Sequence, residues 1–278
     1  MSSRRTGIRF ESKALDQLPK RFLFFPSLLL VAYLFSACAG NSPQKPATQL
    51  LLPTRKIDPA TTGSVAGKIV LQGAPPAAKP IDMSAEPFCA NRNTTPVLPQ
   101  QVVTGDAGSL ANVVVYVKDF PADYIVDPAP SMATLTQRGC MYDPHIIALR
   151  SGQTLEIKND DQATHNILAM PSQNPKWNRS ETPGAAPLEE TFAIPELAIP
   201  LRCNIHPWMK TYVFVFSHPY YAVTGKDGQF ELKNLPPGTY TIEAWQEKYG
   251  VQESTITIGA KESKPLNFAF SAASGAGN

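Results

Sequence analysis

The sequence has no helical periodicity of any length, no cluster of basic residues interleaved with aromatics, and only four cysteines. The missing helical period, in a chain that contains 27 prolines, argues against helical folds and predicts an all-β protein. The missing basic cluster, with 25 basic against 23 acidic residues, gives no reason to expect nucleic acid as a partner. Because there are only four cysteines, the role of each can be predicted from the residues around it.

A long hydrophobic run is also missing. The apolar stretch that ends near Cys38 is shorter than the about 20 residues that a membrane-spanning helix needs. It follows a basic segment and ends in small residues, so we expect residues 1–37 to be an export signal. Residues 34–38 resemble a bacterial lipobox, which implies that Cys38 is lipidated and anchors the chain to a membrane. A plain signal peptide and an uncleaved anchor are the alternatives.

The chain that follows the signal is nearly neutral. Six of the 25 basic and two of the 23 acidic residues precede Cys38, which leaves 19 basic and 21 acidic residues. Residues 38–62 are rich in Pro, Thr and Ala and lack a period, so we expect a tether between the membrane and a folded body. This places the folded body in the bacterial periplasm or at the cell surface.

The stretch CNIHPWM, residues 203–209, contains three soft or borderline metal ligands within seven residues. Cys203, His206 and Met209 lack only a second imidazole to complete the His₂Cys set with a weak axial Met that suits copper in electron transfer. His165 is the best candidate, because it follows an alternating run, residues 154–158, and would lie near a strand end. The sequence therefore predicts one metal site built from these four side chains.

CNIHPWM together with HNI at residues 165–167 resembles the blue copper proteins, or cupredoxins, and the short ligand loop resembles that of amicyanin. The resemblance implies a Greek-key sandwich over residues 129–217, one type-1 copper ion and the transfer of single electrons. It also implies that Asn166 ties the first ligand strand to the loop that bears Cys203. Pro207 has no N–H to donate toward the thiolate, so we expect it to alter the reduction potential.

The resemblance has two further consequences. His206 would be the ligand that faces solvent and passes electrons. Four protein ligands would leave no open position for a substrate, so we expect an electron carrier and not an enzyme. The protein partners in such a transfer cannot be named from the residues. The alternative is a surface-anchored binding module, for glycan, protein or stored copper, without a redox role.

Cys89 and Cys140 remain once lipid and metal have taken the other two cysteines. An exported chain can oxidise such a pair, and closing a loop of about 50 residues would stabilise the fold by roughly 4 kcal/mol. Free buried thiols are one alternative to this disulfide. A zinc site is the other, and its ligands would be Cys140, His145, Cys203 and His206.

The C-terminal part has a different character. Turns at residues 225–228 and 236–238 flank alternating strands. These motifs resemble the carboxypeptidase regulatory-like domain, a small transthyretin-like, Ig-like β-sandwich whose usual opening strands stand instead at residues 63–71 and 112–117. We therefore expect a discontinuous sandwich, residues 63–128 with 218–270, into which the copper domain is inserted on two linkers. Residues 271–278 would form a disordered tail.

Overall fold

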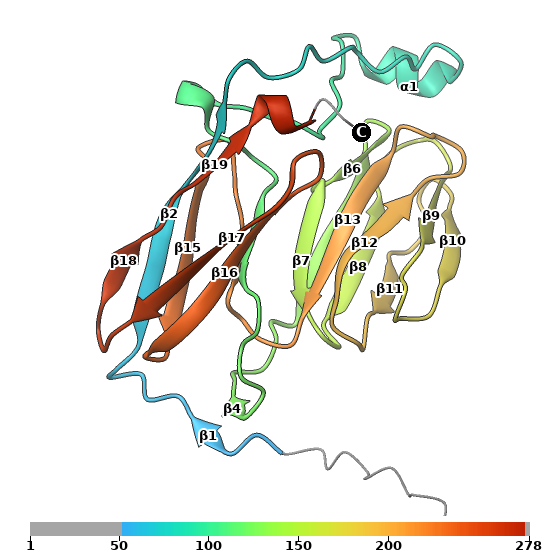
Figure 1. Ribbon diagram of the computed structural model, residues 1–278. Coiled ribbons are helices and arrows are strands. Elements are labelled where there is room, and N and C mark those ends of the chain that lie inside the picture. The colour runs from blue at the N-terminus through green and yellow to red at the C-terminus, as the bar shows by residue number, and fades with distance from the viewer. Residues whose placement is uncertain (1–51, 276–278) are drawn as a thin grey trace, which may run out of the picture. The chain divides into compact units, whose positions relative to one another are not determined.

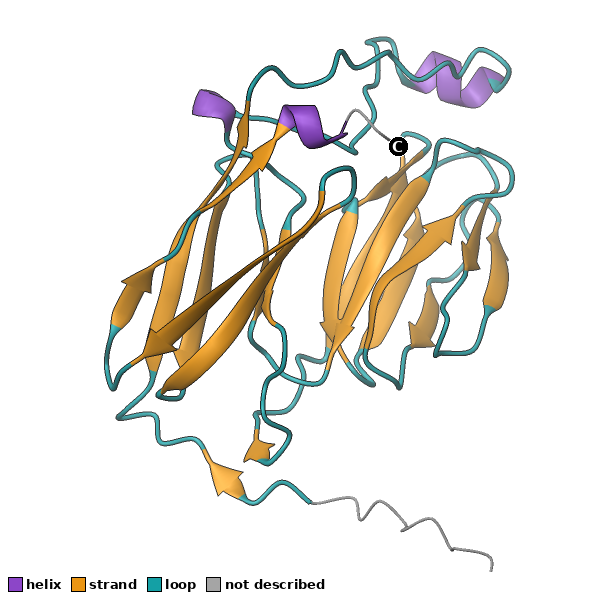
Figure 2. Ribbon diagram, viewed as in Figure 1, coloured by secondary structure: helices purple, strands orange, loops and turns teal. Residues whose placement is uncertain are grey.

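The computed structural model describes residues 52–275 and shows a protein built almost entirely of β-strands (Figure 2), which confirms the predicted fold class. The helices in the described range are α1 (Pro87–Arg92), η1 (Asp106–Gly108) and η2 (Ala272–Gly275). None of the described helices has the length and apolar character needed to cross a membrane. The predicted signal and Cys38 lie outside the described residues.

The first sandwich consists of two sheets that enclose one hydrophobic core. The five-stranded sheet has the order β10 (Trp177–Glu181), β9 (His165–Ala169), β12 (Glu196–Arg202), β13 (Lys210–Phe216), β7 (Ile146–Arg150). The four-stranded sheet has the order β11 (Leu188–Thr191), β8 (Thr154–Asn159), β5 (Met132–Arg138), β6 (Met141–Asp143). Alternate side chains of each strand point inward, and the inward side chains are mostly apolar, so they form the core.

The second sandwich combines strands from both ends of the described chain (Figure 1). One sheet has the order β14 (Tyr221–Val223), β3 (Val114–Val117), β16 (Gly238–Gln246), β17 (Gly250–Ile258). In the other, β2 (Gly63–Gln72) pairs with β15 (Gln229–Leu235), β18 (Ser263–Pro265) and β19 (Phe268–Ser271). If the predicted copper domain is inserted into the second sandwich, β2 must pair with C-terminal strands, as it does here. The exact domain boundaries stay a prediction.

A third hydrophobic cluster joins the two sandwiches. Strand β3 is buried on both faces: Val115 and Val117 point into the second sandwich, and Val114 and Tyr116 point out of it. The outward pair packs with residues of the first sandwich, namely Ile146, Phe214 and Phe216. The expectation that the first sandwich merely hangs from two linkers is therefore wrong, because apolar side chains of both sandwiches bury one another.

The segment between β2 and β3 departs from the expected domain assignment. Residues 81–97, here called the cap, run over one end of the first sandwich and include α1 (Figure 1). Met83 and Cys89 of the cap are buried in the core of the first sandwich, and Cys89 forms a disulfide with Cys140. Residues 63–128 thus do not all belong to the second sandwich, because the disulfide and these apolar side chains attach the cap to the first.

Both predicted flexible ends are more ordered than expected. Within the predicted tether, β1 (Arg55–Lys56) pairs with β4 (Tyr124–Ile125), and the Lys261 N–H donates to the Thr61 carbonyl. At the other end, Ser271 belongs to β19 and residues 272–275 form η2. The tether and the tail are therefore shorter than predicted, because backbone hydrogen bonds fix their inner parts. Residues 276–278 lie outside the described range.

Candidate metal centre

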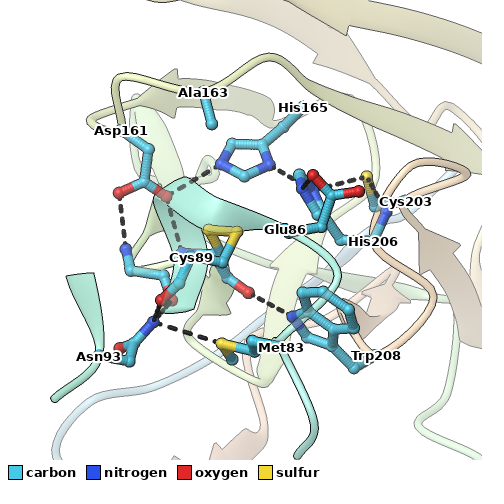
Figure 3. Close-up of a disulfide and its surroundings, with 12 residues drawn as sticks. Met83, Glu86, Cys89, Asn93, Asp161, Ala163, His165, Cys203, His206 and Trp208 are labelled. Atoms are coloured by element: carbon cyan, nitrogen blue, oxygen red, sulfur yellow. Dashed lines mark hydrogen bonds and ion pairs between the residues drawn. A yellow bond between two sulfur atoms is a disulfide. The ribbon is translucent and has the colours of Figure 1, made fainter. Parts of the chain in front are cut away.

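Three of the four predicted ligands bring their donor atoms together at one end of the first sandwich (Figure 3). His165 is the first residue of β9, and Cys203 and His206 belong to the loop between β12 and β13. The Nδ1 atoms of the two histidines lie 2.9 Å apart, and the Cys203 Sγ lies 3.7 Å from the His206 Nδ1. All three side chains are buried, and their donor atoms fall within 4.8 Å of one another.

The ligand loop is closed by its own backbone. The Cys203 N–H donates to the Met209 carbonyl over 3.1 Å, and the Met209 N–H donates to the His206 carbonyl over 2.9 Å. Met209, the fourth predicted ligand, is fully buried in the same hydrophobic cluster as Cys203. The short spacing of the motif thus folds into a compact turn in which all loop ligands are held from within.

The environment of Cys203 favours its thiolate. Burial raises the pKa of the thiol, but hydrogen bonds from His165 and from the backbone amides of His206, Asn166 and Ile205 outweigh burial and lower it. The His206 N–H lies 3.3 Å from the sulfur. Since metals bind the thiolate and not the thiol, these donors prepare Cys203 to act as a ligand.

Asn166 links the two parts of the site, as the resemblance implies. Its Oδ1 accepts a hydrogen bond of 2.6 Å from the Asn204 N–H, directly after Cys203. Its Nδ2 donates to the side chain of Asn178 and, over 3.3 Å, to the Arg179 carbonyl in β10. Asn166 therefore fixes the position of the Cys203 loop relative to β9 and β10.

Asp161 is a functional residue that sequence reasoning missed. Its carboxylate is buried and accepts a hydrogen bond of 2.9 Å from the His165 Nε2, opposite the nitrogen that faces His206. It also accepts from the Gly139 and Cys140 amides, over 2.7 and 2.8 Å. Burial raises the pKa of Asp161, but these three hydrogen bonds outweigh burial and lower it. Burial lowers the pKa of His165, but Asp161 and Cys203 raise it to about 9.

His206 is covered, so the expectation that it faces solvent is wrong. Its side chain is 2% exposed, because the cap and the disulfide lie over it. The Glu86 carboxylate of the cap approaches its Nε2 to 3.9 Å, and the Trp208 ring centroid lies 5.3 Å from its own. Burial and the neighbouring His165 both lower the pKa of His206, which favours the neutral form of this imidazole.

The zinc alternative is not assembled. Cys140 is taken by the disulfide, and His145, directly before β7, bonds through Nε2 to Glu247 of the second sandwich over 2.7 Å. Pro207 and Trp208 line a cavity of about 270 Å³ beside this pair. The Trp208 Nε1–H donates to the Cys140 carbonyl over 2.9 Å and so attaches the ligand loop to the disulfide.

A second buried carboxylate stands across from His165. Glu181 is the register partner of His165 in the β9–β10 pair and is 1% exposed. Burial raises its pKa to about 7, although a hydrogen bond from Gln137 opposes the shift. Its Oε1 has no hydrogen-bond partner among the described residues. Nothing in the sequence around Glu181 marked it, because its burial depends on strand pairing.

The donor set fits a copper ion. Two imidazole nitrogens and one thiolate sulfur converge, and a thioether lies in the same loop, which is the combination of soft and borderline donors that copper prefers. Carboxylate oxygens, which suit harder ions, contact only the outer nitrogens of the histidines. The residues that would hold the ion are His165, Cys203, His206 and Met209.

Comparison with known proteins supports the reading of the C-terminal part. Residues 210–271 match the carboxypeptidase regulatory-like domain family. Rhamnogalacturonate lyase A of Emericella nidulans is 36% identical over 56 residues, which are 20% of this chain and 11% of that enzyme. The chain thus spans about a tenth of the curated relative that it matches.

Solved structures similar to part of the chain include copper proteins. A purple cupredoxin from Nitrosopumilus maritimus is 21% identical and covers 30% of this chain and 99% of its own, with a TM-score of 0.26. A copper-containing nitrite reductase from Thermus scotoductus is 21% identical, and the match covers 44% of this chain and 27% of the reductase, with a TM-score of 0.27. An amicyanin mutant in its Cu(I) form is 17% identical, and the match covers 37% of this chain and 98% of the amicyanin, also with a TM-score of 0.27.

The metal centre is defined by the donor geometry of His165, Cys203 and His206. The family match is independent of that geometry, and it covers the turns at residues 225–228 and 236–238. Residues 210–271 of this chain are therefore similar to the carboxypeptidase regulatory-like domain, as predicted from the sequence.

Proposed function

We propose that this chain is an exported type-1 copper protein that carries single electrons between redox partners. The observation that supports this most is the convergence of His165 Nδ1, His206 Nδ1 and Cys203 Sγ, all buried and within 4.8 Å of one another, with Met209 in the same closed loop. Copper held there would supply a one-electron couple between Cu(I) and Cu(II).

The surrounding residues would keep the donors in one arrangement in both oxidation states. Asp161 accepts from His165 Nε2 and so leaves Nδ1 for the metal, while Asn166 holds the loop against β9. Burial of the donors excludes water from the site. Because little can rearrange, electron transfer would need little reorganisation.

The same arrangement argues against catalysis at the metal. Catalytic metal sites keep a coordination position open for water or substrate. Here four protein ligands would fill the site, and the cap with its disulfide covers the His206 side. We therefore propose an electron carrier rather than an enzyme.

Electrons would enter and leave through Trp208 rather than through His206 directly. The Trp208 ring contacts His206 at 5.3 Å between centroids and is only partly buried. It also lines the cavity beside Pro207. Trp208 thus takes the place of the solvent-facing histidine that the sequence led us to expect.

The location of the protein follows from residues outside the described range. We propose that residues 1–37 direct export, that lipidated Cys38 anchors the chain, and that the folded body works in the periplasm or at the cell surface. The redox partners would be other proteins of the envelope.

Voltammetry of the copper-loaded protein on an electrode tests the proposed function. We expect one reversible one-electron wave with fast exchange, and the wave should be lost in Cys203→Ser. A copper-loaded protein without a reversible wave would contradict electron transfer and favour a binding module. The matched control is Cys89→Ser/Cys140→Ser, which removes two other cysteines and should keep the wave.

A further inference from the structure

We propose that Cys89 and Cys140, in their dithiol form, bind a second soft metal ion of the Cu(I) class, with His206 as the third donor. The sulfurs of both cysteines and a ring nitrogen of His206 lie within 4.8 Å of one another. All three side chains are buried, with His206 2% exposed. Thiolates and an imidazole are the donors that Cu(I) selects in proteins.

In this proposal His206 binds the second ion through Nε2, the nitrogen that the first site leaves free. Its Nδ1 is directed at His165 and Cys203, at 2.9 and 3.7 Å. Its Nε2 lies instead 3.9 Å from the carboxylate of Glu86, the residue that directly precedes α1, which carries Cys89. His206 therefore belongs to two groups of possible ligands, one with His165 and Cys203 and one with Cys89 and Cys140.

Hydrogen bonds that do not depend on the disulfide hold both cysteines in place. The Cys140 N–H donates to Asp161 over 2.8 Å, and the Trp208 Nε1–H donates to the Cys140 carbonyl over 2.9 Å. Asn93 Nδ2 donates to the carbonyls of Cys89 and Gly139, over 2.9 and 3.0 Å. After cleavage of the S–S bond the two sulfurs would thus stay within reach of one ion.

The span between the two cysteines also fits. Two sulfurs bound to one ion at about 2.3 Å each lie about 4 Å apart in a tetrahedral arrangement. The Cα atoms of Cys89 and Cys140 are 5.7 Å apart, so side-chain rotation alone can reach this separation.

The dithiol form arises in two ways. The chain leaves the ribosome with its cysteines reduced, and a dithiol reductant regenerates them by passing two electrons and two protons to the disulfide while it becomes a disulfide itself. Cu(I) binding then displaces the two thiol protons to solvent, and the Nε2 proton of His206 leaves as that nitrogen binds. No change in the oxidation state of the ion is involved.

The test is the Cu(I) stoichiometry of the full folded chain, measured by competition with a chromophoric Cu(I) chelator under argon. The disulfide form is compared with protein reduced by dithiothreitol and desalted. We expect one equivalent in the disulfide form and two in the dithiol form. One equivalent in both forms would overturn the second site.

Two variants separate this site from the proposed electron carrier. Cys203→Ser removes the first site, and in its dithiol form it should still bind one equivalent, with two sulfurs and one nitrogen in the X-ray absorption spectrum. No binding by that form would also overturn the proposal. Cys89→Ser/Cys140→Ser should bind one equivalent under both conditions and turn blue with Cu(II), which shows that it is folded. A second equivalent that persists in this double variant would place the extra ion elsewhere and refute the assignment.

Discussion

Asp161 should set the reduction potential of the copper site, and Asp161→Asn tests this with almost no change in size. The carboxylate receives hydrogen bonds from His165, Gly139 and Cys140 within 2.9 Å. An Asn offers only one oxygen to these three donors, so the variant loses the negative charge behind His165 and at least one hydrogen bond. A less basic His165 stabilises Cu(II) less, and the potential should rise.

The size of the effect follows from the contacts. Loss of a carboxylate or carbonyl partner of a ligating histidine typically costs about 10- to 100-fold in metal affinity. If this loss falls on Cu(II), each factor of ten is about 59 mV for one electron, so we expect a rise of about 60 to 120 mV. A buried amide left without its acceptor costs about 1 to 3 kcal/mol of the free energy of unfolding.

Asp160→Asn is the matched control, because it makes the same change one residue away. Asp160 is 40% exposed and pairs with Arg138 at 2.6 Å, away from the metal ligands. Voltammetry should show no shift for this variant and the full rise for Asp161→Asn, and urea unfolding should report the stability loss for Asp161→Asn only. A folded, copper-loaded Asp161→Asn protein with an unchanged or lower potential would refute this role of Asp161.

Four further predictions concern other parts of the chain. Cys203→Ser should abolish the blue colour, whereas Met209→Leu should keep copper and shift the potential; equal loss in both, seen by absorption, would count against the ligand assignment. The pKa of Glu181 in the folded protein is about 7, above the usual 4.5, so its contribution to stability is present below about pH 4.5 and is lost as the pH rises to about 7. In urea unfolding of the metal-free protein, the free energy of unfolding of Glu181→Gln should therefore depend less on pH than that of the unchanged protein. An identical pH dependence in the two proteins would contradict this. Cys38→Ser should no longer partition with membranes in cell fractionation, and retention there would indicate an uncleaved anchor. The isolated segment 129–217 should unfold at least about 4 kcal/mol more easily than the same sandwich in the full chain, because it lacks the disulfide to Cys89 and the packing of its outer apolar side chains on β3; equal stability in urea would contradict both contributions.

The strands, and the convergence of His165, Cys203 and His206, are predictable from the sequence because their signals are local. The expected strands at residues 63–71, 112–117 and 154–158 appear as β2, β3 and β8 with ends shifted by no more than two residues. The spacing of Cys203, His206 and Met209 fits one loop, and the alternating run before His165 places this histidine near a strand end, where the structure has it. Two cysteines left over in a chain with a predicted export signal pointed to the disulfide that the structure contains.

The cap and the buried acids could not be foreseen, since they depend on contacts between distant residues. Cys89 and Cys140 are 51 residues apart, and nothing near Glu86 or Met83 shows that this segment covers His206. Asp161 stands four residues before His165, in a polar stretch that reads as an ordinary turn. The carboxylate of Asp161 reaches His165 only because β9 pairs with its neighbouring strands and the chain turns back at Gly139.

The most direct test of the central claim is the spectrum of the purified protein after one equivalent of Cu(II). A thiolate ligand from Cys203, with His165 and His206 beside it and Met209 as a weak axial donor, predicts an intense blue colour and a narrow copper hyperfine splitting in the EPR spectrum. A pale solution with the wide splitting of a copper site made of nitrogen and oxygen ligands would contradict the type-1 copper assignment.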